Sequence, residues 1–258
     1  MIFIQPSIDP VIFSLGFVDI RWYSLAYILA FIFGSLIIKK LNSESYNSLS
    51  AAQIDKFFVW AVVGVILGGR IGYVIFYQTN LFLSNPLYLL EIWNGGMSFH
   101  GGLGGIILAM YFFCLKYKIQ FFYLADLVSI VAPIGLFMGR ISNFINTELY
   151  GRITNFSFAI IYPDIDNNPR HPSQLYEALF EGIILFFILY IYFKLNPKKY
   201  SIGNLSALFL IFYSIFRFII EYLREPDFQI GLLFNYFSMG QLLCIPLLLG
   251  GLMILYRK

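Results

Sequence analysis

The strongest constraint on this chain is a series of long apolar segments, each close to the length of a membrane-spanning helix. Such a helix needs roughly 20 mainly apolar residues, because it rises about 1.5 Å per residue through a hydrocarbon core of about 30 Å. Of the 258 residues, 59% are hydrophobic and only 12% are charged, which is too few charges for a water-soluble domain. We therefore predict an all-α polytopic membrane protein, a single integral domain over residues 1–258. The expected spans are residues 19–38, 57–77, 97–115, 121–140, 175–193, 204–222 and 236–256.

The lysines predict how these spans are oriented. If about seven spans alternate in direction, every lysine falls on one side of the membrane: Lys39, Lys40, Lys56, Lys116, Lys118, Lys194, Lys198, Lys199 and Lys258. Basic residues in short loops mark the cytoplasmic side. The sequence therefore predicts an outer N-terminus, a cytoplasmic C-terminus and small extracytoplasmic elements, the longest over about 152–174. The apolar stretch 81–93 is broken by Pro86 and is not expected to span; it should lie at the interface or be re-entrant against protein.

Most arginines do not follow the lysines, and several lie inside the expected spans. Distances along the helices, at about 1.5 Å per residue, place a set of ionisable groups roughly 20–30 Å from the cytoplasmic boundary. The set is Arg70, His100, Arg140, Glu177 and Arg217. Ionisable residues within spans usually face the interior of the helix bundle and usually serve function. We therefore expect a polar site in the outer half of the bilayer.

The stretch GRISNFINTELYG, residues 139–151, is the densest group of polar residues at the end of a span. Arg140, Asn143 and Asn146 are spaced by three, so a continuing helix would place them on one face. An arginine fork and neutral amides suit a phosphate group, and Glu148 could hold Arg140 or a substrate hydroxyl. The alternative is a polar helix end at the outer interface, closed by Gly151.

A second polar strip lies in YSIFRFIIEYLRE, residues 213–225. Spacings of four, four and three stack Tyr213, Arg217, Glu221 and Arg224 on one helical face. Arg217 and Glu221 could form a structural ion pair inside the membrane. The additional cation at Arg224 favours an anion-binding strip instead.

Three further candidate residues are open to a structural interpretation. His100 lies in GGMSFHGGLGG and titrates near neutrality, so it could act as a base, or it could be a hydrogen-bonded packing residue. Arg70 lies between glycines in LGGRIGYV, and binding and packing roles are equally compatible with that position. Tyr23, beside Arg21 in DIRWYSLAY, fits an aromatic belt at the membrane surface.

The sequence contains no metal-ligand cluster, no nucleophilic serine elbow and no phosphate-binding Walker loop, so no metal or other cofactor is predicted. A transporter for an anionic solute would also use intramembrane arginines. It should, however, show internal repeats and polar groups through both halves of the bilayer. Apart from Asp126, the cytoplasmic half is nearly free of such groups. A structural scaffold would not need two arginines near a histidine.

Eight stretches of the chain, taken in order, resemble bacterial prolipoprotein diacylglyceryl transferases. They run from residue 9 to residue 246, and individually the shorter ones would be weak evidence. The stretches are DPVIFSLG, RWYSLAY, GGRIGYV, NGGMSFHGGLGG, GRISNFINTELYG, RHPSQLYE, FRFIIEYLREPD and SMGQLLCIP. The stretch between Gly151 and His171 is short where some members carry an insertion. Ser142 and Thr147 stand where the family often has small residues, and we expect both to be tolerated.

The resemblance implies an enzyme that transfers the diacylglyceryl group of phosphatidylglycerol to the lipobox cysteine of a prolipoprotein. It implies a multi-pass protein of the bacterial inner membrane with its site facing the outer leaflet. The implied partners are phosphatidylglycerol, the lipobox of the prolipoprotein signal peptide and membrane lipids, without nucleic acid.

The same resemblance assigns roles to the candidate residues. Arg140 and Arg217 would hold the phosphate, with Asn143, Asn146 and Glu148 binding the rest of the headgroup. Glu221 and Arg224 would position that array, and His100, with Tyr23 nearby, is the first candidate for the base. The remaining residues expected to contact substrate are Arg70, Gly151 and Tyr213.

Overall fold

The protein is described from a computed structural model, which covers residues 3–16, 18–46, 49–91, 93, 95–226, 231, 233 and 236–257. The chain forms two compact units. The first unit comprises the chain up to Ile38 and from Asp126 onward, and the second unit is Lys39–Ala125. The boundaries between them fall inside two helices, α1 (Trp22–Glu44) and α5 (Phe121–Ile145). The single integral domain stays a prediction.

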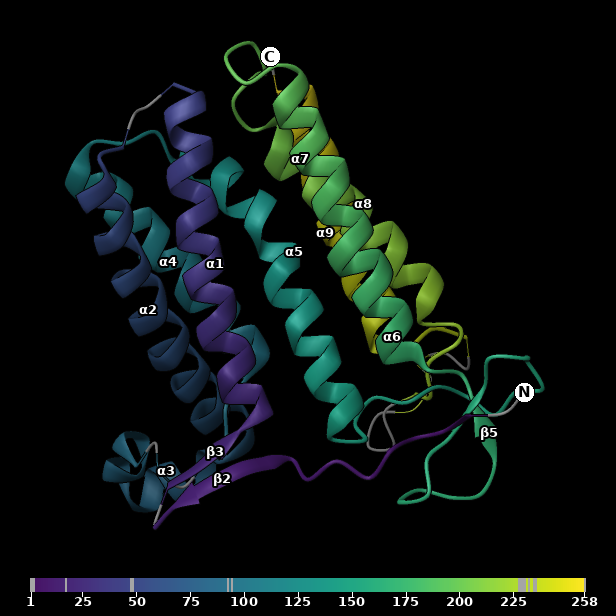
Figure 1. Ribbon diagram of the computed structural model, residues 1–258. Helices are drawn as coiled ribbons and strands as arrows, with labels where there is room; N and C mark the ends of the chain where they lie inside the picture. Colours follow the sequence, from purple (N-terminus) through teal and green to yellow (C-terminus); the bar gives the residue numbers. More distant parts are fainter. Residues whose placement is uncertain are drawn as a thin grey trace. The chain divides into compact units, whose positions relative to one another are not determined.

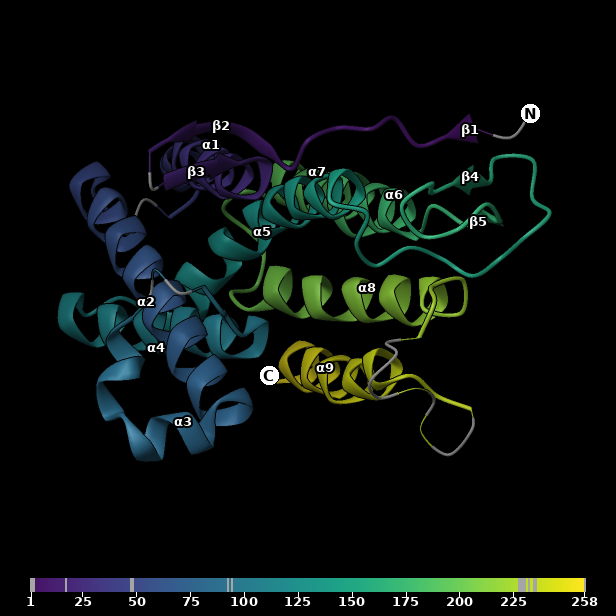
Figure 2. The same cartoon turned by 90° about the horizontal axis from the view of Figure 1, so that it is seen from below.

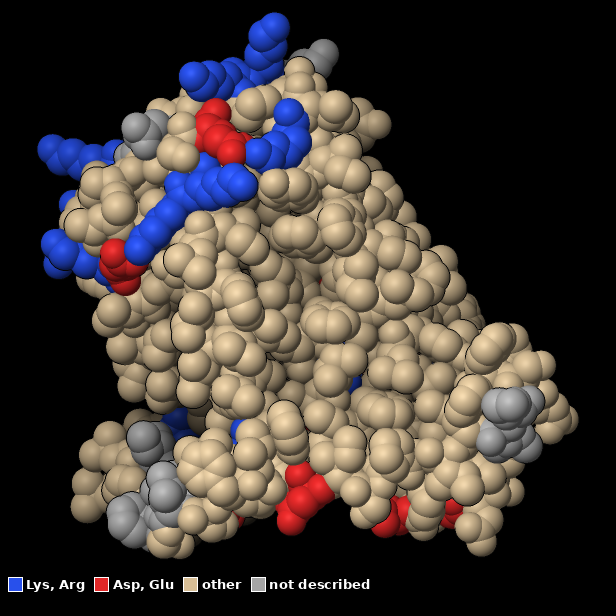
Figure 3. Space-filling model, in the orientation of Figure 1, with Lys and Arg blue, Asp and Glu red and all other residues tan. Residues whose placement is uncertain are grey.

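Helices of membrane-spanning length dominate the fold (Figure 1), which confirms an all-α polytopic membrane protein. Six are long and apolar enough to cross a membrane: α1, α2 (Ala51–Tyr77), α4 (Phe99–Tyr117), α5, the continuous helix Ser173–Leu195 and α9 (Met239–Tyr256). The shorter helix α8 covers Asn204–Ile220. Each expected span overlaps one of these seven helices, whereas their orientation in the membrane stays a prediction. On the face drawn in Figure 3, the middle stretches of the helices show almost no charged side chains, which gather near the helix ends.

In the second unit, glycines bring α2 and α4 into backbone contact. A Cβ atom added to Gly64 would lie 2.7 Å from the carbonyl oxygen of Gly105, and one added to Gly68 would lie 2.7 Å from the Cα atom of Gly105. Small residues at such spacings let membrane helices approach closely. The two helices are linked through α3 (Thr79–Ser84) and the short 3₁₀ helix η1 (Pro86–Leu90). In its described residues, the broken stretch 81–93 thus includes short helices only, and its expected place in the membrane stays a prediction.

In the first unit, α6 (Ser173–Glu177), the π-helical segment η3 (Ala178–Ile184) and α7 (Leu185–Leu195) form one continuous rod. Helix α8 packs against α9 (Figure 2). At Gly182 the rod touches α5, because an added Cβ atom would lie 2.6 Å from the Cβ atom of Phe137. The Asp126 carboxylate on α5 accepts hydrogen bonds from the backbone amides of Gly203 (2.6 Å) and Ser206 (2.8 Å), which fixes the first turn of α8 beside α5.

The first unit also contains two small sheets of short strands. β1 (Phe3–Ile4) pairs in parallel with β4 (Ile160–Ile161), and β4 pairs antiparallel with β5 (Pro169–Arg170). β2 (Val11–Leu15) and β3 (Val18–Arg21) form a hairpin just before α1. The sequence predicted small extracytoplasmic elements but not these strands, and β1, β4 and β5, with two residues each, are too short to carry an alternating pattern. The pairing of β1 with β4 fastens the N-terminal segment to the segment after α5.

Candidate functional site

Charged side chains of the first unit meet in a buried group that we call the ion cluster. Its members are Arg140, Glu177, Glu181, Arg217, Glu221 and Arg224. Their side chains are between 0% and 15% exposed. The cluster pairs three arginines with three glutamates, so its formal charge is balanced.

Arg140 enters the cluster from the last turns of α5. It follows Phe137, the residue that touches Gly182, by one helical turn, so the close approach of α5 to the rod brings its guanidinium beside two carboxylates. Its Nε atom lies 3.0 Å from Oε2 of Glu177, and its Nη2 atom lies 3.3 Å from Oε2 of Glu181.

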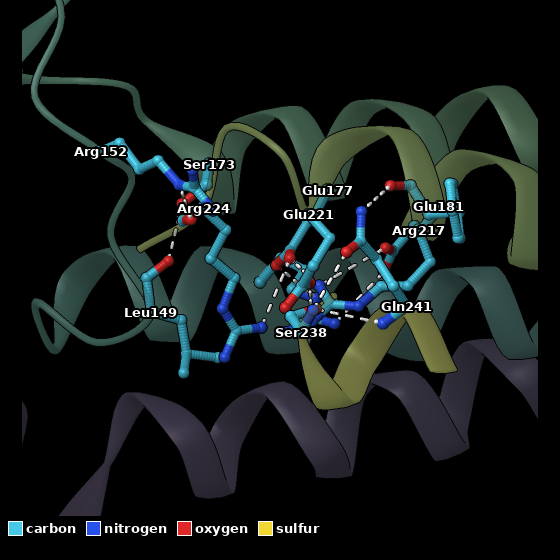
Figure 4. Close-up of polar contacts among 12 residues, drawn as sticks. Leu149, Arg152, Ser173, Glu177, Glu181, Arg217, Glu221, Arg224, Ser238 and Gln241 are labelled. Carbon is cyan, nitrogen blue, oxygen red and sulfur yellow. Dashed lines mark hydrogen bonds and ion pairs between the residues drawn. The ribbon is translucent and has the colours of Figure 1, made fainter. Parts of the chain in front are cut away.

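Arg217 enters from α8 and forms ion pairs with all three glutamates of the cluster (Figure 4). Its Nη1 atom pairs with Oε1 of Glu177, and its Nη2 atom lies 2.6 Å from Oε2 of Glu221, one turn further along. Arg224 approaches Oε1 of Glu177 at 3.6 Å. Tyr213, one turn before Arg217, stacks on Phe209 with 5.8 Å between ring centroids. The strip predicted from the spacing of these residues therefore exists, but its central anion is Glu177.

The ion cluster lies far from the basic end of its helices. Glu177 precedes Lys194 by 17 residues on the same rod, or about 25 Å at the α-helical rise. Taking a charge out of water costs several kcal/mol, which only well-placed counter-charges offset. Arg140, Glu177 and Arg217 do meet at one level, as the distances along the helices predicted for these three residues.

The turn after α5 presents the next group of candidate residues. Asn143 donates to Oε2 of Glu148 at 2.9 Å, and Asn146 donates to Oε1 of the same carboxylate at 3.4 Å. Glu148 therefore holds the two amides, whereas the predicted pairing with Arg140 is wrong because Glu177 and Glu181 occupy that guanidinium. The predicted continuous helical face is also wrong for Asn146, since α5 ends at Ile145.

This turn is strained, and its carbonyl groups are pinned from the rod. Thr147 and Leu149 both have φ values of 58°, in the left-handed region, which costs roughly 1–3 kcal/mol for such a residue. The side chains of Gln174 and Ser173 donate to the carbonyl oxygens of Glu148 (2.6 Å) and Leu149 (2.7 Å). These two hydrogen bonds attach the backbone that carries Glu148 to the first residues of the rod.

The N-terminal segment holds the same turn from the other side. Gln5 donates to the carbonyl oxygen of Phe144 at 2.5 Å and accepts a hydrogen bond from the Thr147 hydroxyl at 3.1 Å. A left-handed conformation favours glycine, so a threonine at position 147 is strained. In this chain the hydroxyl bond to Gln5 offsets part of the strain.

Gly151 marks a close backbone crossing. Its amide donates to the carbonyl oxygen of His171 at 2.9 Å, and it forms an isolated antiparallel bridge with Arg224. A Cβ atom at this position would lie 2.7 Å from the carbonyl oxygen of Leu223. The glycine therefore lets the segment after α5 pack onto the end of α8 and so places Arg224, while its predicted contact with substrate stays a prediction.

Outside the spans, Arg170 organises the segment before α6. Its Nη2 atom lies 2.6 Å from Oδ2 of Asp166, and its Nη1 atom lies 3.1 Å from Oε2 of Glu225. The hydrogen bonds from Arg170 lower the pKa of Asp166 to about 2. Burial lowers the pKa of His171, so this histidine favours its neutral form. Its Nδ1 atom lies 3.3 Å from the Tyr176 hydroxyl at the entry to the rod.

In the second unit, Arg70 is 2% exposed. Among the residues that the structure describes, its guanidinium donates hydrogen bonds to backbone carbonyl groups only. It donates to the carbonyl oxygens of Tyr88 (2.6 Å), Leu89 (3.2 Å) and Gly95 (2.6 Å). Its guanidinium also lies over the Tyr88 ring, 4.6 Å from the centroid. These contacts favour the structural interpretation, and a contact with substrate stays a prediction.

His100 begins α4 as its second residue and is exposed. It borders a hollow of about 360 Å³ together with Phe76, Tyr77 and Ser98. Tyr23, in the first unit, lies at the start of α1 with its ring centroid 5.4 Å from that of Tyr27. Because His100 and the ion cluster belong to different units, the role of this histidine as a base toward that site stays a prediction.

Comparison with known proteins identifies the family. A family model described as prolipoprotein diacylglyceryl transferase matches residues 10–257. This chain belongs to the prolipoprotein diacylglyceryl transferase family.

Curated relatives cover almost the whole chain. The phosphatidylglycerol–prolipoprotein diacylglyceryl transferase of Rickettsia typhi (strain Wilmington) is 50% identical over 255 residues, which is 98% of each chain. Those of Rickettsia bellii (strain OSU 85-389) and Rickettsia felis are 49% and 50% identical, over 98% and 95% of this chain and 96% and 95% of theirs. The resemblance read from the sequence is therefore confirmed.

For this diacylglyceryl transferase family member, the sequence interpretation missed two residues that the structure places at the site. Glu181 is fully buried between Arg140 and Arg217. Its signal was available, because Glu177 and Glu181 are four residues apart in an otherwise apolar span. Gln5 was also missed, and no periodicity could have found it, because it acts from an irregular segment 139 residues away from Phe144.

Proposed function

We propose that this chain transfers the diacylglyceryl group of phosphatidylglycerol to the lipobox cysteine of a prolipoprotein. The supporting observation is the ion cluster, which brings three guanidinium groups together at the end of the rod farthest from Lys194. Phosphatidylglycerol carries an anionic phosphodiester, and planar guanidinium groups bind phosphate oxygens in bidentate fashion.

The proposed reaction is a displacement at carbon. The cysteine thiolate attacks the glyceryl carbon that bears the phosphate, a C–S bond forms, and the C–O bond to the phosphate breaks. The electron pair of that bond leaves with the phosphate oxygen, giving glycerol phosphate. The thiol proton passes to a base, for which His100 is the first candidate, and Tyr23 is the other catalytic residue that the resemblance implies.

Arg140 and Arg217 carry the main catalytic role in this proposal. The leaving phosphate gains a negative charge as the C–O bond breaks, so cations fixed beside it stabilise the transition state more than the ground state. Asn143, Asn146 and Glu148 offer donors and acceptors to the hydroxyls of the headgroup. Glu221 and Arg224 keep the guanidinium of Arg217 in place, and Tyr213 borders the same strip.

The location of the reaction follows from the charge pattern. Lys194, Lys198 and Lys199 lie at one end of the rod, and the ion cluster lies near the other. With the lysines in the cytoplasm, the site opens to the outer leaflet of the bacterial inner membrane, where a prolipoprotein signal peptide emerges.

The decisive experiment is incubation of the purified protein, in phosphatidylglycerol vesicles, with a peptide that carries a lipobox. Mass spectrometry should show the peptide gain one diacylglyceryl unit on its cysteine, and glycerol phosphate should appear in equal amount. A peptide with serine in place of that cysteine is the matched control. Absence of the mass gain with a competent peptide would contradict the proposal.

A further inference from the structure

The charge balance of the ion cluster leaves little room for a bound anion. Each arginine of the cluster already has a carboxylate partner: Arg140 has Glu177 and Glu181, Arg217 has Glu177 and Glu221, and Arg224 has Glu177. A lipid phosphate would need the same N–H groups. Its entry therefore requires one carboxylate to give up its place.

The two carboxylates of the rod are held unequally. Glu177 contacts all three arginines, with its Oε2 atom 3.0 Å from Arg140. Glu181 contacts only two, at 3.3 Å from Arg140 and at 3.9 Å from Arg217. One oxygen atom of each carboxylate, Oε1 of Glu181 and Oε2 of Glu177, is buried without a hydrogen-bond donor among the described residues, so the difference between the two lies in their ion pairs. Glu181 is therefore the more weakly held anion, although its side chain is 0% exposed.

The backbone around Glu181 also differs from that around Glu177. Glu177 ends the α-helical segment α6, whereas Glu181 lies in the middle of the π-helical segment Ala178–Ile184. A π-helical turn holds one more residue than an α-helical turn, and such turns are frequent at functional sites. A small change of this wider turn would move the Glu181 carboxylate without moving Glu177.

We infer that Glu181 is an internal placeholder for the lipid phosphate. In the unoccupied cluster its carboxylate neutralises Arg140 and Arg217, and on binding the phosphate of phosphatidylglycerol takes over these two contacts. Glu177 and Glu221 keep their contacts and continue to position the arginines. This inference rests on the proposed function, and it assigns Glu181 a role in substrate affinity.

The exchange between Glu181 and the lipid phosphate explains how the arginines can lie close together when no lipid is bound. The guanidinium groups of Arg140 on α5 and Arg217 on α8 repel each other in a medium of low dielectric constant unless an anion lies between them. Glu181 supplies that anion when lipid is absent. The consequence is a competition, in which every gain in the stability of the empty site weakens the binding of phosphatidylglycerol.

Glu181→Gln tests the competition, because it removes the charge and keeps the size of the side chain. We expect the KM for phosphatidylglycerol to fall about tenfold, which corresponds to about 1.4 kcal/mol and to the low end of measured couplings for close charge pairs. Inhibition by added glycerol phosphate, the released product, should strengthen in the same direction. An unchanged or higher KM in a folded variant would overturn the inference.

Glu177→Gln is the matched control, on the same rod and equally buried. Because Glu177 holds three arginines, its loss should raise the KM and lower kcat. If both variants raised the KM alike, Glu181 would be a structural anion like Glu177, and the inference would fail.

A second variant decides the matter if Glu181→Gln does not fold. Glu181→Asp retains the charge but withdraws the carboxylate by one methylene from both arginines, so the KM should again fall, by a smaller factor. A KM equal to or above that of the wild type would contradict the inference. Failure of the proposed function is separate, because the wild-type protein would then form no thioether at all.

Discussion

Both units bury arginines in apolar helices, and these arginines differ in the kind of partner that they bind. Arg217 of the first unit pairs with carboxylates, whereas Arg70 of the second unit donates to three backbone carbonyl oxygens. A carboxylate can be exchanged for another anion such as a phosphate. A carbonyl group of the protein's own backbone has no such substitute, so Arg70 fixes the backbone at Tyr88, Leu89 and Gly95. An arginine inside a span is therefore not sufficient evidence of a binding site, and the kind of partner distinguishes the two cases.

The largest effect should come from Arg140. We expect Arg140→Ala to abolish transfer, with a loss of at least about 100-fold to 1,000-fold, because it removes a cation that stabilises the leaving phosphate. The measurement is thioether formation on a lipobox peptide by membrane-inserted protein. Substantial turnover by this variant would refute the role of Arg140 at the phosphate.

Arg140→Lys separates chemistry from folding in the same position. It keeps the positive charge that Glu177 and Glu181 require but loses the planar fork that grips two oxygens. We expect near-normal thermal stability with activity still reduced strongly. Full activity would mean that charge alone, without the fork geometry, is sufficient at this position.

Substitution of Arg70 should instead lower the stability of the folded protein. Arg70→Met leaves the carbonyl oxygens of Tyr88, Leu89 and Gly95 without this donor, at a cost of roughly 1–3 kcal/mol for each buried acceptor that finds no other partner. We expect a clear fall in melting temperature and in the yield of folded protein. A normal melting temperature combined with lost transfer would instead place Arg70 with the ion cluster as a substrate-binding residue.

The sequence predicted those parts of the fold and the site that follow from helical periodicity. The apolar segments predicted the spanning helices, and the spacing of Arg217 and Glu221 predicted that they share one helical face, where they form the ion pair that was the less favoured alternative. Residues that meet through irregular backbone were not predictable in this way. Asn146 lies past the end of α5, and Glu148 pairs with amides because the left-handed conformations of Thr147 and Leu149 reverse the chain. Tertiary contact, as between Gln5 and Thr147, has no local signal.

The turn that carries Glu148 offers a finer test, since its strain is local to the first unit. Gln5→Leu removes the hydrogen bond to Thr147, and we expect it to destabilise the turn by about 1 kcal/mol and to raise the KM for phosphatidylglycerol. Thr147→Gly relieves the left-handed strain and removes the need for that bond. Gln5→Leu should therefore cost much less in a Thr147→Gly background.

A double-mutant cycle measures this coupling directly, with melting temperature and KM determined for all four proteins. Equal costs of Gln5→Leu in both backgrounds would show that the two residues act independently. In that case the hydrogen bond between them would not explain how threonine is tolerated at position 147.

The smallest effect concerns Arg170, which differs from Arg217 and Arg70 because its partner lies outside the spans. That partner, Asp166, is 28% exposed. Hydrogen bonds from Arg170 lower the pKa of Asp166 to about 2, below its ordinary value of 3.8. A carboxyl group with a depressed pKa in the folded state stabilises that state above its unfolded pKa. The contribution is thus fully present above about pH 4 and lost as the pH falls toward about 2.

Melting temperatures of the wild type and of Asp166→Asn, compared from pH 6 to pH 2, test this dependence. Above pH 4 the wild type should be slightly more stable, and the difference should close as the pH approaches 2, because both proteins then carry a neutral side chain. Added salt should shrink the difference, since the pair is partly exposed to solvent. The ion cluster should resist the same salt because it is buried. A difference that stays constant with pH would show that Asp166 acts through packing and not through its charge.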